Sequence, residues 1–177
     1  SYGVVGNCLV SNNTSRYSGG GIYSYNNSQI NNTIVRNSSG SEGAGVYANY
    51  NASLTNCILW GNEKNGVPNN IGGTSTVENS AVEGGCEGDS IIVLNENNLP
   101  LFVNPSSTAG ASVSTSNADW HLQNGSVCVN RGSNAAVNDS LDLDGTARIK
   151  RDTVDLGCYE SNYYSVPVQY CSTVHNR

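Results

Sequence analysis

The sequence predicts an all-β fold in which short parallel strands coil into a β-helix with a repeat of about 24 residues. A seven-residue segment starting at residue 7 (NCLVSNN) returns at residue 32 (NTIVRNS) and residue 56 (NCILWGN), and in weaker form at residue 79 (NSAVEGG). The apolar pieces are too short for helices and are separated by Asn, Gly and Ser. A fixed period of this length is typical of stacked units, each too small to bury its apolar face alone.

Each period contains three strand-like pieces. The first lies in the repeated segment, the second at residues 21–23, 45–47 and 70–72, and the third ends at Ile30, Leu54 and Val77. One apolar position per piece, recurring once per turn, predicts strands that pair in parallel with their equivalents about 4.8 Å away. Asparagine is the most frequent residue and glycine occurs 20 times, as expected where the corners of the coil need left-handed backbone.

The alternation of side chains along each strand predicts which residues face the interior. We expect Arg36 and Glu83 to face water, which places Val10 and its equivalents inside the coil. The predicted interior ladders are Val10/Val35/Leu59/Val82, Ile22/Val46/Ile71 and Val5/Ile30/Leu54/Val77. Each buried aliphatic side chain stabilises the fold by about 1.5–3 kcal/mol.

The same alternation leaves an apolar row on the outside of the coil, made of Leu9, Ile34 and Ile58 next to Trp60. Contiguous exposed apolar surface usually marks a contact. We therefore expect the irregular region after Gly85, or a partner molecule, to cover this row.

Charge and composition limit the functional classes. Charged residues make up 12% of the chain and the net charge is −6, so no basic stripe is available to bind a nucleic acid. No apolar stretch is long enough for a transmembrane segment. Because Val5 already belongs to an interior ladder, and raw strand edges are avoided in natural proteins, we expect these residues to be the C-terminal part of a larger protein.

The six cysteines weakly favour an exported protein. Cys8 and Cys57 share one position in the coil two turns apart, which is about 9.6 Å at sheet spacing and beyond the ~7 Å Cα limit for a disulfide. We therefore expect both to be buried free thiols that pack as small apolar side chains. The cysteines outside the regular coil can pair with one another: Cys86, Cys128, Cys158 and Cys171.

Several segments, most of them beyond the regular turns, carry a resemblance to a known family. They are residues 19–23 (GGGIY), 56–62, 101–105 (LFVNP), 119–123 (DWHLQ) through 129–132 (VNRG), 142–149 (DLDGTARI) and 155–160 (DLGCYE). With them the chain resembles the surface β-helix proteins of Bacteroidetes and related bacteria that are grouped as choice-of-anchor Q domain proteins. The glycine triplet also occurs in outer-membrane adhesins, whereas the last two segments, in this order, are more specific.

The resemblance implies a right-handed parallel β-helix that is closed by an irregular C-terminal cap and exported to the outer surface of a bacterial cell. We divide the chain into regular turns (1–94), final turns and cap (95–160), and a tail of unknown role (161–177). Cys128 and Cys158 stand where the family pattern usually has alanine, which makes them a candidate cap disulfide. A second candidate pair, Cys86 with Cys171, rests on position alone.

The regular turns do not assemble a catalytic site. β-Helix enzymes that cleave acidic polysaccharides need a basic residue as proton acceptor and a calcium ion or further cations to neutralise charge. The only cations in these turns are Arg16, Arg36 and Lys64, without an acidic ladder, and His121 is expected to pack in the cap. We therefore expect a non-catalytic chain. The alternatives are part of a polysaccharide lyase or glycoside hydrolase, and a purely structural stalk.

Four acidic residues gather in the cap segments: Asp142, Asp144, Asp155 and Glu160. The Asp-x-Asp-Gly motif at 142–145 resembles the start of a calcium loop, so Asp142 and Asp144 are candidate calcium ligands. The twelfth position of such a loop is Thr153 rather than an acidic residue. The simpler hypothesis is a structural network in which Arg148 pairs with one aspartate and loop amides bind the other carboxylates.

Aromatic side chains on the outside of the turns suggest a binding surface. Tyr23 and Tyr47 are expected to be outward neighbours in adjacent turns, with Tyr25, Tyr50 and Trp60 near them. Exposed rings with surrounding asparagines suit stacking on sugar rings, although such tyrosines can also simply cover a sheet. The sequence therefore predicts a secreted or cell-surface domain for adhesion or glycan binding, whose partner is a glycan or another ligand of the host or cell surface.

Overall fold

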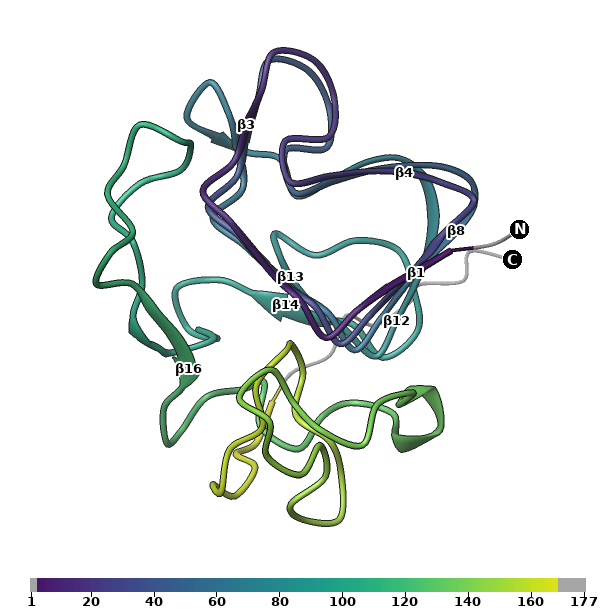
Figure 1. The fold of residues 1–177 in the computed structure, drawn as a ribbon, viewed down its shortest axis with the longest axis vertical. Helices are drawn as coiled ribbons and strands as arrows, with labels where there is room; N and C mark the ends of the chain where they lie inside the picture. Colours follow the sequence, from purple (N-terminus) through teal and green to yellow (C-terminus); the bar gives the residue numbers. More distant parts are fainter. Residues whose placement is uncertain (1–2, 169–177) are drawn as a thin grey trace.

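The computed structural model describes residues 3–168 and forms a parallel β-solenoid of about three turns, followed by an irregular C-terminal region (Figure 1). Helical structure in the described residues is limited to the short 3-10 helix η1 (Asn134–Ala136). The predicted all-β parallel coil with a spacing of about 24 residues is confirmed.

Three sheets form the walls of the coil, and strands from successive turns lie side by side in each of them. Sheet A consists of β1 (Val4–Gly6), β5 (Ser28–Ile30), β8 (Val46–Thr55) and β12 (Ile71–Glu78), with β4 (Ile22–Tyr25) also paired to β8. Sheet B consists of β2 (Leu9–Ser11), β6 (Thr33–Val35), β9 (Ile58–Trp60), β13 (Ala81–Glu83) and β14 (Ile92–Leu94). Sheet C consists of β3 (Thr14–Ser15), β7 (Ser38–Ser39), β10 (Glu63–Lys64) and β11 (Val67–Pro68). A separate antiparallel pair follows, made of β15 (Phe102–Asn104) and β16 (Asp119–Leu122).

The register of sheet B corrects the predicted alignment of the second turn. Val10 pairs with Ile34, Ile34 with Leu59, and Leu59 with Val82. The left-handed corner before these strands is occupied by Asn31 (φ 53°), not by Asn32. Two adjacent asparagines make this corner ambiguous in the sequence. A shift of one residue moves every side chain to the opposite face, so Ile34 faces the interior and Val35 faces outward.

The same shift corrects the third ladder, in which Gln29 replaces Ile30. Val5 pairs with Gln29 and Gln29 pairs with Leu54, while Ile30 is half-buried beside Thr55. The second ladder, in which Ile22, Val46 and Ile71 lie opposite one another, is confirmed. Leu54, Leu59 and Val46 are fully buried as expected, whereas Ile22, in the first turn of the described coil, is only half-buried.

Buried asparagines bind one turn to the next at the corner between sheets B and C. The backbone N–H of Asn37 donates to Oδ1 of Asn62 (3.0 Å), and the amide of Asn37 donates to the carbonyl of Val10 (2.9 Å). Asn62 in turn donates to the carbonyl of Ile34 (2.8 Å). Both asparagines are fully buried. These side chains satisfy backbone groups that the corner removes from the sheet ladder, as buried polar groups require.

The region after Gly85 covers the outer face of sheet B, as predicted, but the covered row differs from the predicted one. Thr33 stands in the place assigned to Ile34, and Val35 in the place assigned to Arg36. Val35 and Ile58 are buried in a second apolar cluster outside the coil. This cluster includes Phe102, Trp120, Leu122, Val127, Cys128, Val129 and Leu156 from the C-terminal region. Figure 1 shows β16 and the green and yellow C-terminal segments alongside sheet B. The coil therefore has two apolar layers, one inside and one beneath the cap.

Arg36 and Glu83 are half-buried, not fully exposed as predicted. Arg36 occupies a left-handed corner (φ 54°) that is taken by Gly61 one turn later, and its guanidinium lies 4.3 Å from the centre of the Trp60 ring. The carboxylate of Glu83 accepts the backbone N–H of Gly61 (2.8 Å). Both charged side chains therefore contact neighbouring groups at the corners of the coil.

Replacement of Leu59 by alanine should lower the free energy of unfolding by about 2–5 kcal/mol, because Leu59 is fully buried in the inner ladder. Urea denaturation followed by circular dichroism measures the change. Val67→Ala is the matched control, since Val67 is 63% exposed, and should change the stability by less than about 0.5 kcal/mol. Equal effects of the two variants would contradict this interior.

Gln29→Met should stabilise the protein by about 1–2 kcal/mol, because Met keeps the length of the side chain and removes a poorly satisfied polar group. Gln29 is fully buried, its amide lies 3.3 Å from the Ser24 hydroxyl, and its Oε1 has no hydrogen-bond partner. The change is measured as a higher melting temperature. Ile30→Met, at the outward neighbour, should not raise it; a Gln29→Met variant less stable than the parent would show that Gln29 is needed in the core.

Candidate functional site

Four tyrosines form two pairs on the outer face of sheet A, which we call the tyrosine face (Tyr23, Tyr25, Tyr47 and Tyr50). Tyr23 of β4 lies opposite Tyr47 of β8, with ring centres 5.2 Å apart and planes inclined by 28°. Tyr25 and Tyr50 have ring centres 4.6 Å apart. Tyr23, Tyr25 and Tyr50 remain 58%, 56% and 63% exposed. The expected outward stacking of Tyr23 on Tyr47 is thus present.

The alternation of side chains along β4 and a left-handed residue within β8 determine where these four rings lie. Ile22 and Ser24 of β4 point inward, so Tyr23 and Tyr25 point outward. Tyr50 has a left-handed backbone (φ 51°) within β8, an uncommon conformation for a bulky residue. Its ring reaches Tyr25 of the preceding turn. The result is an aromatic surface that spans two adjacent turns.

Trp60, which the sequence analysis grouped with the tyrosines, lies on a different wall of the coil. It belongs to β9 of sheet B, and its ring packs against Phe102 (5.9 Å between centres) and beneath Arg36. Trp60 is therefore part of the contact between coil and cap. The repeat already places Trp60 in the first strand of its turn, whereas Tyr23 and Tyr47 follow in the second piece of theirs.

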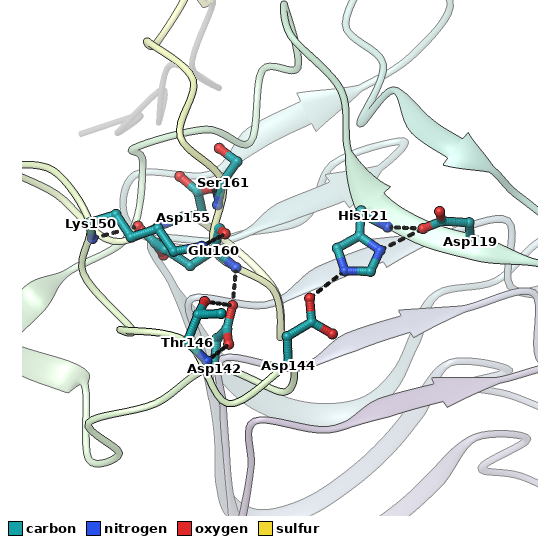
Figure 2. Close-up of polar contacts among 9 residues, drawn as sticks. All are labelled: Asp119, His121, Asp142, Asp144, Thr146, Lys150, Asp155, Glu160 and Ser161. Carbon is teal, nitrogen blue, oxygen red and sulfur yellow. Dashed lines mark hydrogen bonds and ion pairs between the residues drawn. The ribbon is translucent and has the colours of Figure 1, made fainter.

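A second group of functional side chains lies in the cap, around His121 (Figure 2). His121 Nδ1 lies 2.6 Å from Oδ1 of Asp119, and Nε2 lies 2.7 Å from Oδ2 of Asp144. The imidazole also stacks on the Tyr159 ring, with 4.0 Å between centres. Alternation along β16 buries Trp120 and turns His121 toward the cap. The sequence expectation of a packing histidine is consistent with these contacts, but its two carboxylate partners were not anticipated.

The two carboxylates determine the protonation of His121. Burial alone would lower the pKa of the imidazole, but the hydrogen bonds and charges of Asp144 and Asp119 outweigh it and raise the pKa. Burial would likewise raise the pKa of Asp119, and its bonds to His121 lower it instead. A protonated imidazole donates from both nitrogens and has no lone pair left to accept a proton. His121 in this arrangement tethers β16 to the loop at 142–146.

Asp142 and Asp144, the candidate calcium ligands, have separate partners. The carboxylate of Asp142 accepts the backbone N–H (2.7 Å) and the hydroxyl (2.9 Å) of Thr146 and the backbone N–H of Glu160 (3.0 Å). Burial would raise the pKa of Asp142, but these hydrogen bonds lower it. Asp144 instead binds His121. Across residues 3–168, no group of three His, Cys, Asp or Glu side chains is placed to hold a metal ion.

Asp155 and Glu160 organise the turn that closes the cap. Asp155 accepts the backbone N–H groups of Asn130 and Ser161, both at 2.7 Å. Glu160 accepts the backbone N–H of Asp155 (2.9 Å). Burial, reinforced by the charge of Asp155, raises the pKa of Glu160 to about 7. Loop amides thus bind these carboxylates, as the structural hypothesis predicted.

Arg148 departs from the same hypothesis. It is fully buried and donates to the backbone carbonyls of Asp155 (3.1 Å) and Gly157, not to an aspartate carboxylate. Burial lowers its pKa, against the raising effect of the nearby Glu160, Asp142 and Asp155 charges. The contact with carbonyls results from the tight turn at Gly157 (φ 86°). Sequence spacing does not reveal such a turn.

A pocket of about 340 Å³ opens beside this network. It is lined by His121, Asp144, Tyr159 and Glu160, among others. Both imidazole nitrogens of His121 are already bonded to carboxylates, one of them Asp144, and Glu160 turns its carboxylate to loop amides. The network therefore joins β16 to the loops at 142–146 and 155–161 of the cap.

The cysteines agree in part with expectation. Cys8 and Cys57 are free thiols as predicted, although Cys8 is only half-buried. Cys128 and Cys158 are also free and buried, so the bridge suggested by the resemblance is not formed. Burial raises the pKa of Cys57, Cys128 and Cys158 to about 12. Each packs as an apolar side chain. Cys171 and His175 lie outside the described residues, and the pairing of Cys86 with Cys171 stays a prediction.

Comparisons with protein-family models, with curated proteins and with solved structures found no match to this chain. Among residues 3–168, no helix has the length and apolar character needed to cross a membrane.

The melting temperature should fall as the pH rises from about 4.5 to 8. The folded-state pKa of Glu160 is raised from 4.5 to about 7, and that of His121 is raised above 6.5. A group whose pKa is higher in the folded protein contributes its full stabilisation when the pH is below its unfolded-state pKa. This contribution is lost as the pH rises through its folded-state pKa. Glu160→Gln should therefore flatten the profile between pH 4.5 and 7 and make the protein more stable than the parent at pH 8.

Thermal melts at pH 4.5, 6 and 8 measure this effect. Glu87→Gln, at an exposed carboxylate, is the control and should preserve the profile of the parent. Parallel profiles for the parent and Glu160→Gln would show that burial does not perturb Glu160.

Proposed function

We propose that this chain is a non-catalytic β-helix domain that binds glycans through the tyrosine face and acts in adhesion at a cell surface. The observation that carries the proposal is the pairing of four tyrosines across adjacent turns, with three of them more than half exposed. Exposed rings in such number, away from the cap contact, have no packing role that accounts for all of them.

The chemistry of this surface suits a sugar chain. Aromatic rings offer apolar faces, and phenolic hydroxyls and amides supply hydrogen bonds at their edges. Asn49 lies opposite Tyr25, and Asn26 follows it at a left-handed corner. The two tyrosine pairs are held by parallel strands of a rigid coil. A glycan lying across β4 and β8 would contact both pairs without ordering a loop.

The enzyme alternative would need a free acid or base beside a pocket. The pocket near His121 contains titratable groups, but the imidazole is bonded at both nitrogens, Asp144 binds the imidazole, and Glu160 accepts the backbone N–H of Asp155. These contacts support a non-catalytic chain. The resemblance of residues 142–149 and 155–160 to bacterial surface β-helix proteins supports the proposed location outside the cell.

Tyr23→Ala combined with Tyr25→Ala should weaken glycan binding at least tenfold, which corresponds to about 1.4 kcal/mol. A glycan array identifies the ligand, and isothermal titration calorimetry measures its affinity for parent and variant. The melting temperature should change little, because both rings are exposed.

Tyr17→Ala is the matched control, since Tyr17 is 72% exposed and belongs to neither pair. It should bind like the parent. Equal binding by the double variant would move the site elsewhere, and an array without any bound glycan would favour the structural stalk.

A further inference from the structure

A second pocket in the cap concentrates positive charge on an otherwise acidic protein. The chain carries eight Lys and Arg residues and a net charge of −6. Three of these cations, Arg131, Lys150 and Arg151, line one pocket of about 400 Å³. Among the described residues that line this pocket, Asp152 is the only acidic one. The local charge is therefore opposite in sign to that of the whole chain.

Each of the three cations donates to a backbone carbonyl of the cap. Lys150 Nζ donates to the carbonyl of Glu160 (2.6 Å). Arg151 donates from Nε (3.0 Å) and Nη2 (2.6 Å) to the carbonyl of Asn162, and Arg131 donates to the carbonyl of Val166. Within residues 3–168, none of the three forms an ion pair. Carbonyls orient these groups but leave their charge available.

Among residues 3–168, these cations also have more donors than acceptors bound to them. A guanidinium has five N–H donors and an ammonium has three. The structure accounts for one donor of Arg131, and its Nε is buried without an acceptor. Lys150 uses one donor and Arg151 uses two. An oxyanion in the pocket would supply acceptors for the remaining donors that reach it, in the fork geometry that arginine forms with carboxylate or sulfate.

An aromatic ring completes the pocket. The guanidinium of Arg151 stacks 4.0 Å from the centre of the Tyr164 ring, and Tyr164 remains 73% exposed. The stacking fixes the plane of the guanidinium. The exposed ring and the neighbouring hydroxyls of Thr153 and Ser165 are groups that contact sugars.

We propose that this pocket binds the carboxylate or sulfate group of an acidic sugar. The pocket is built from the cap, whereas the tyrosine face is built from β4 and β8 on the far side of the coil (Figure 1). The two sites are separate, and this inference does not rest on glycan binding by the tyrosines.

Calorimetric titration of the whole chain with glucuronic acid, glucose 6-sulfate and glucose tests the site. The two acidic sugars should bind at least tenfold more tightly than glucose, and their affinity should fall as sodium chloride screens the charges. Arg151→Gln should weaken binding of the acidic sugars at least tenfold. Arg16→Gln removes the same charge from an exposed arginine outside the pocket and should stay within twofold of the parent. The relative affinities of the two acidic sugars tell carboxylate from sulfate.

Equal affinity for glucose and glucuronic acid, or equal loss in Arg151→Gln and Arg16→Gln, would overturn the site. Binding of inorganic sulfate without binding of either acidic sugar would overturn the assignment to a sugar. Arg151 is exposed, and an unchanged melting temperature of Arg151→Gln shows that the fold is intact. The variant without Tyr23 and Tyr25 should bind acidic sugars like the parent; loss of binding there would place the acidic sugar on the tyrosine face instead.

Discussion

The coil depends on the corners between its sheets, where the backbone must turn and yet keep its polar groups paired. Asn7, Asn31, Asn56 and Asn79 adopt left-handed backbone at one corner, with φ between 43° and 56°. At the next corner, the buried amides of Asn37 and Asn62 link each turn to its neighbour. Left-handed backbone costs asparagine less than most residues. The corners set the register, and the register decides which aliphatic side chains fill the interior.

The cap depends on that register in turn. Because the corner lies at Asn31, Thr33 faces outward and its hydroxyl accepts the backbone N–H of Cys158 (3.1 Å). Asn56 makes two further contacts, with its side chain bonded to the backbone of Ser133 at both ends (2.7 and 2.9 Å). The apolar outer face of sheet B would otherwise be open to water, and the cap buries it. Coil and cap therefore share one folded unit rather than two independent ones.

The polar groups that hold the cap together differ from those on the two surfaces that we propose bind ligands. In the cap, carboxylates bind loop amides and one imidazole, so their charges are used within the structure. The tyrosine face and the pocket near Arg151 differ, because their rings and cations keep unused contact area or unused donors. Surfaces of this kind are suited to binding, whereas the network around His121 is suited to holding the cap closed.

Much of the architecture follows from the sequence alone. A period of about 24 residues, strands too short for helices, and asparagine-rich corners determine a parallel coil, and the outward apolar row correctly predicts a covering segment. Tyr23 and Tyr47 lie one period apart, so their stacking is predictable as well. These features depend on short residue patterns, and the patterns recur once per turn.

The tertiary structure decided what periodicity leaves ambiguous. Asn31 and Asn32 are chemically identical, so only pairing with the neighbouring turns shows which one forms the corner. That choice buries Gln29 in place of Ile30 and turns Val35 outward. The cap has no repeat, and its contacts join residues such as Thr33 and Cys158 that are 125 positions apart. Nothing local in the sequence encodes such contacts, because they form only when the whole chain packs against sheet B.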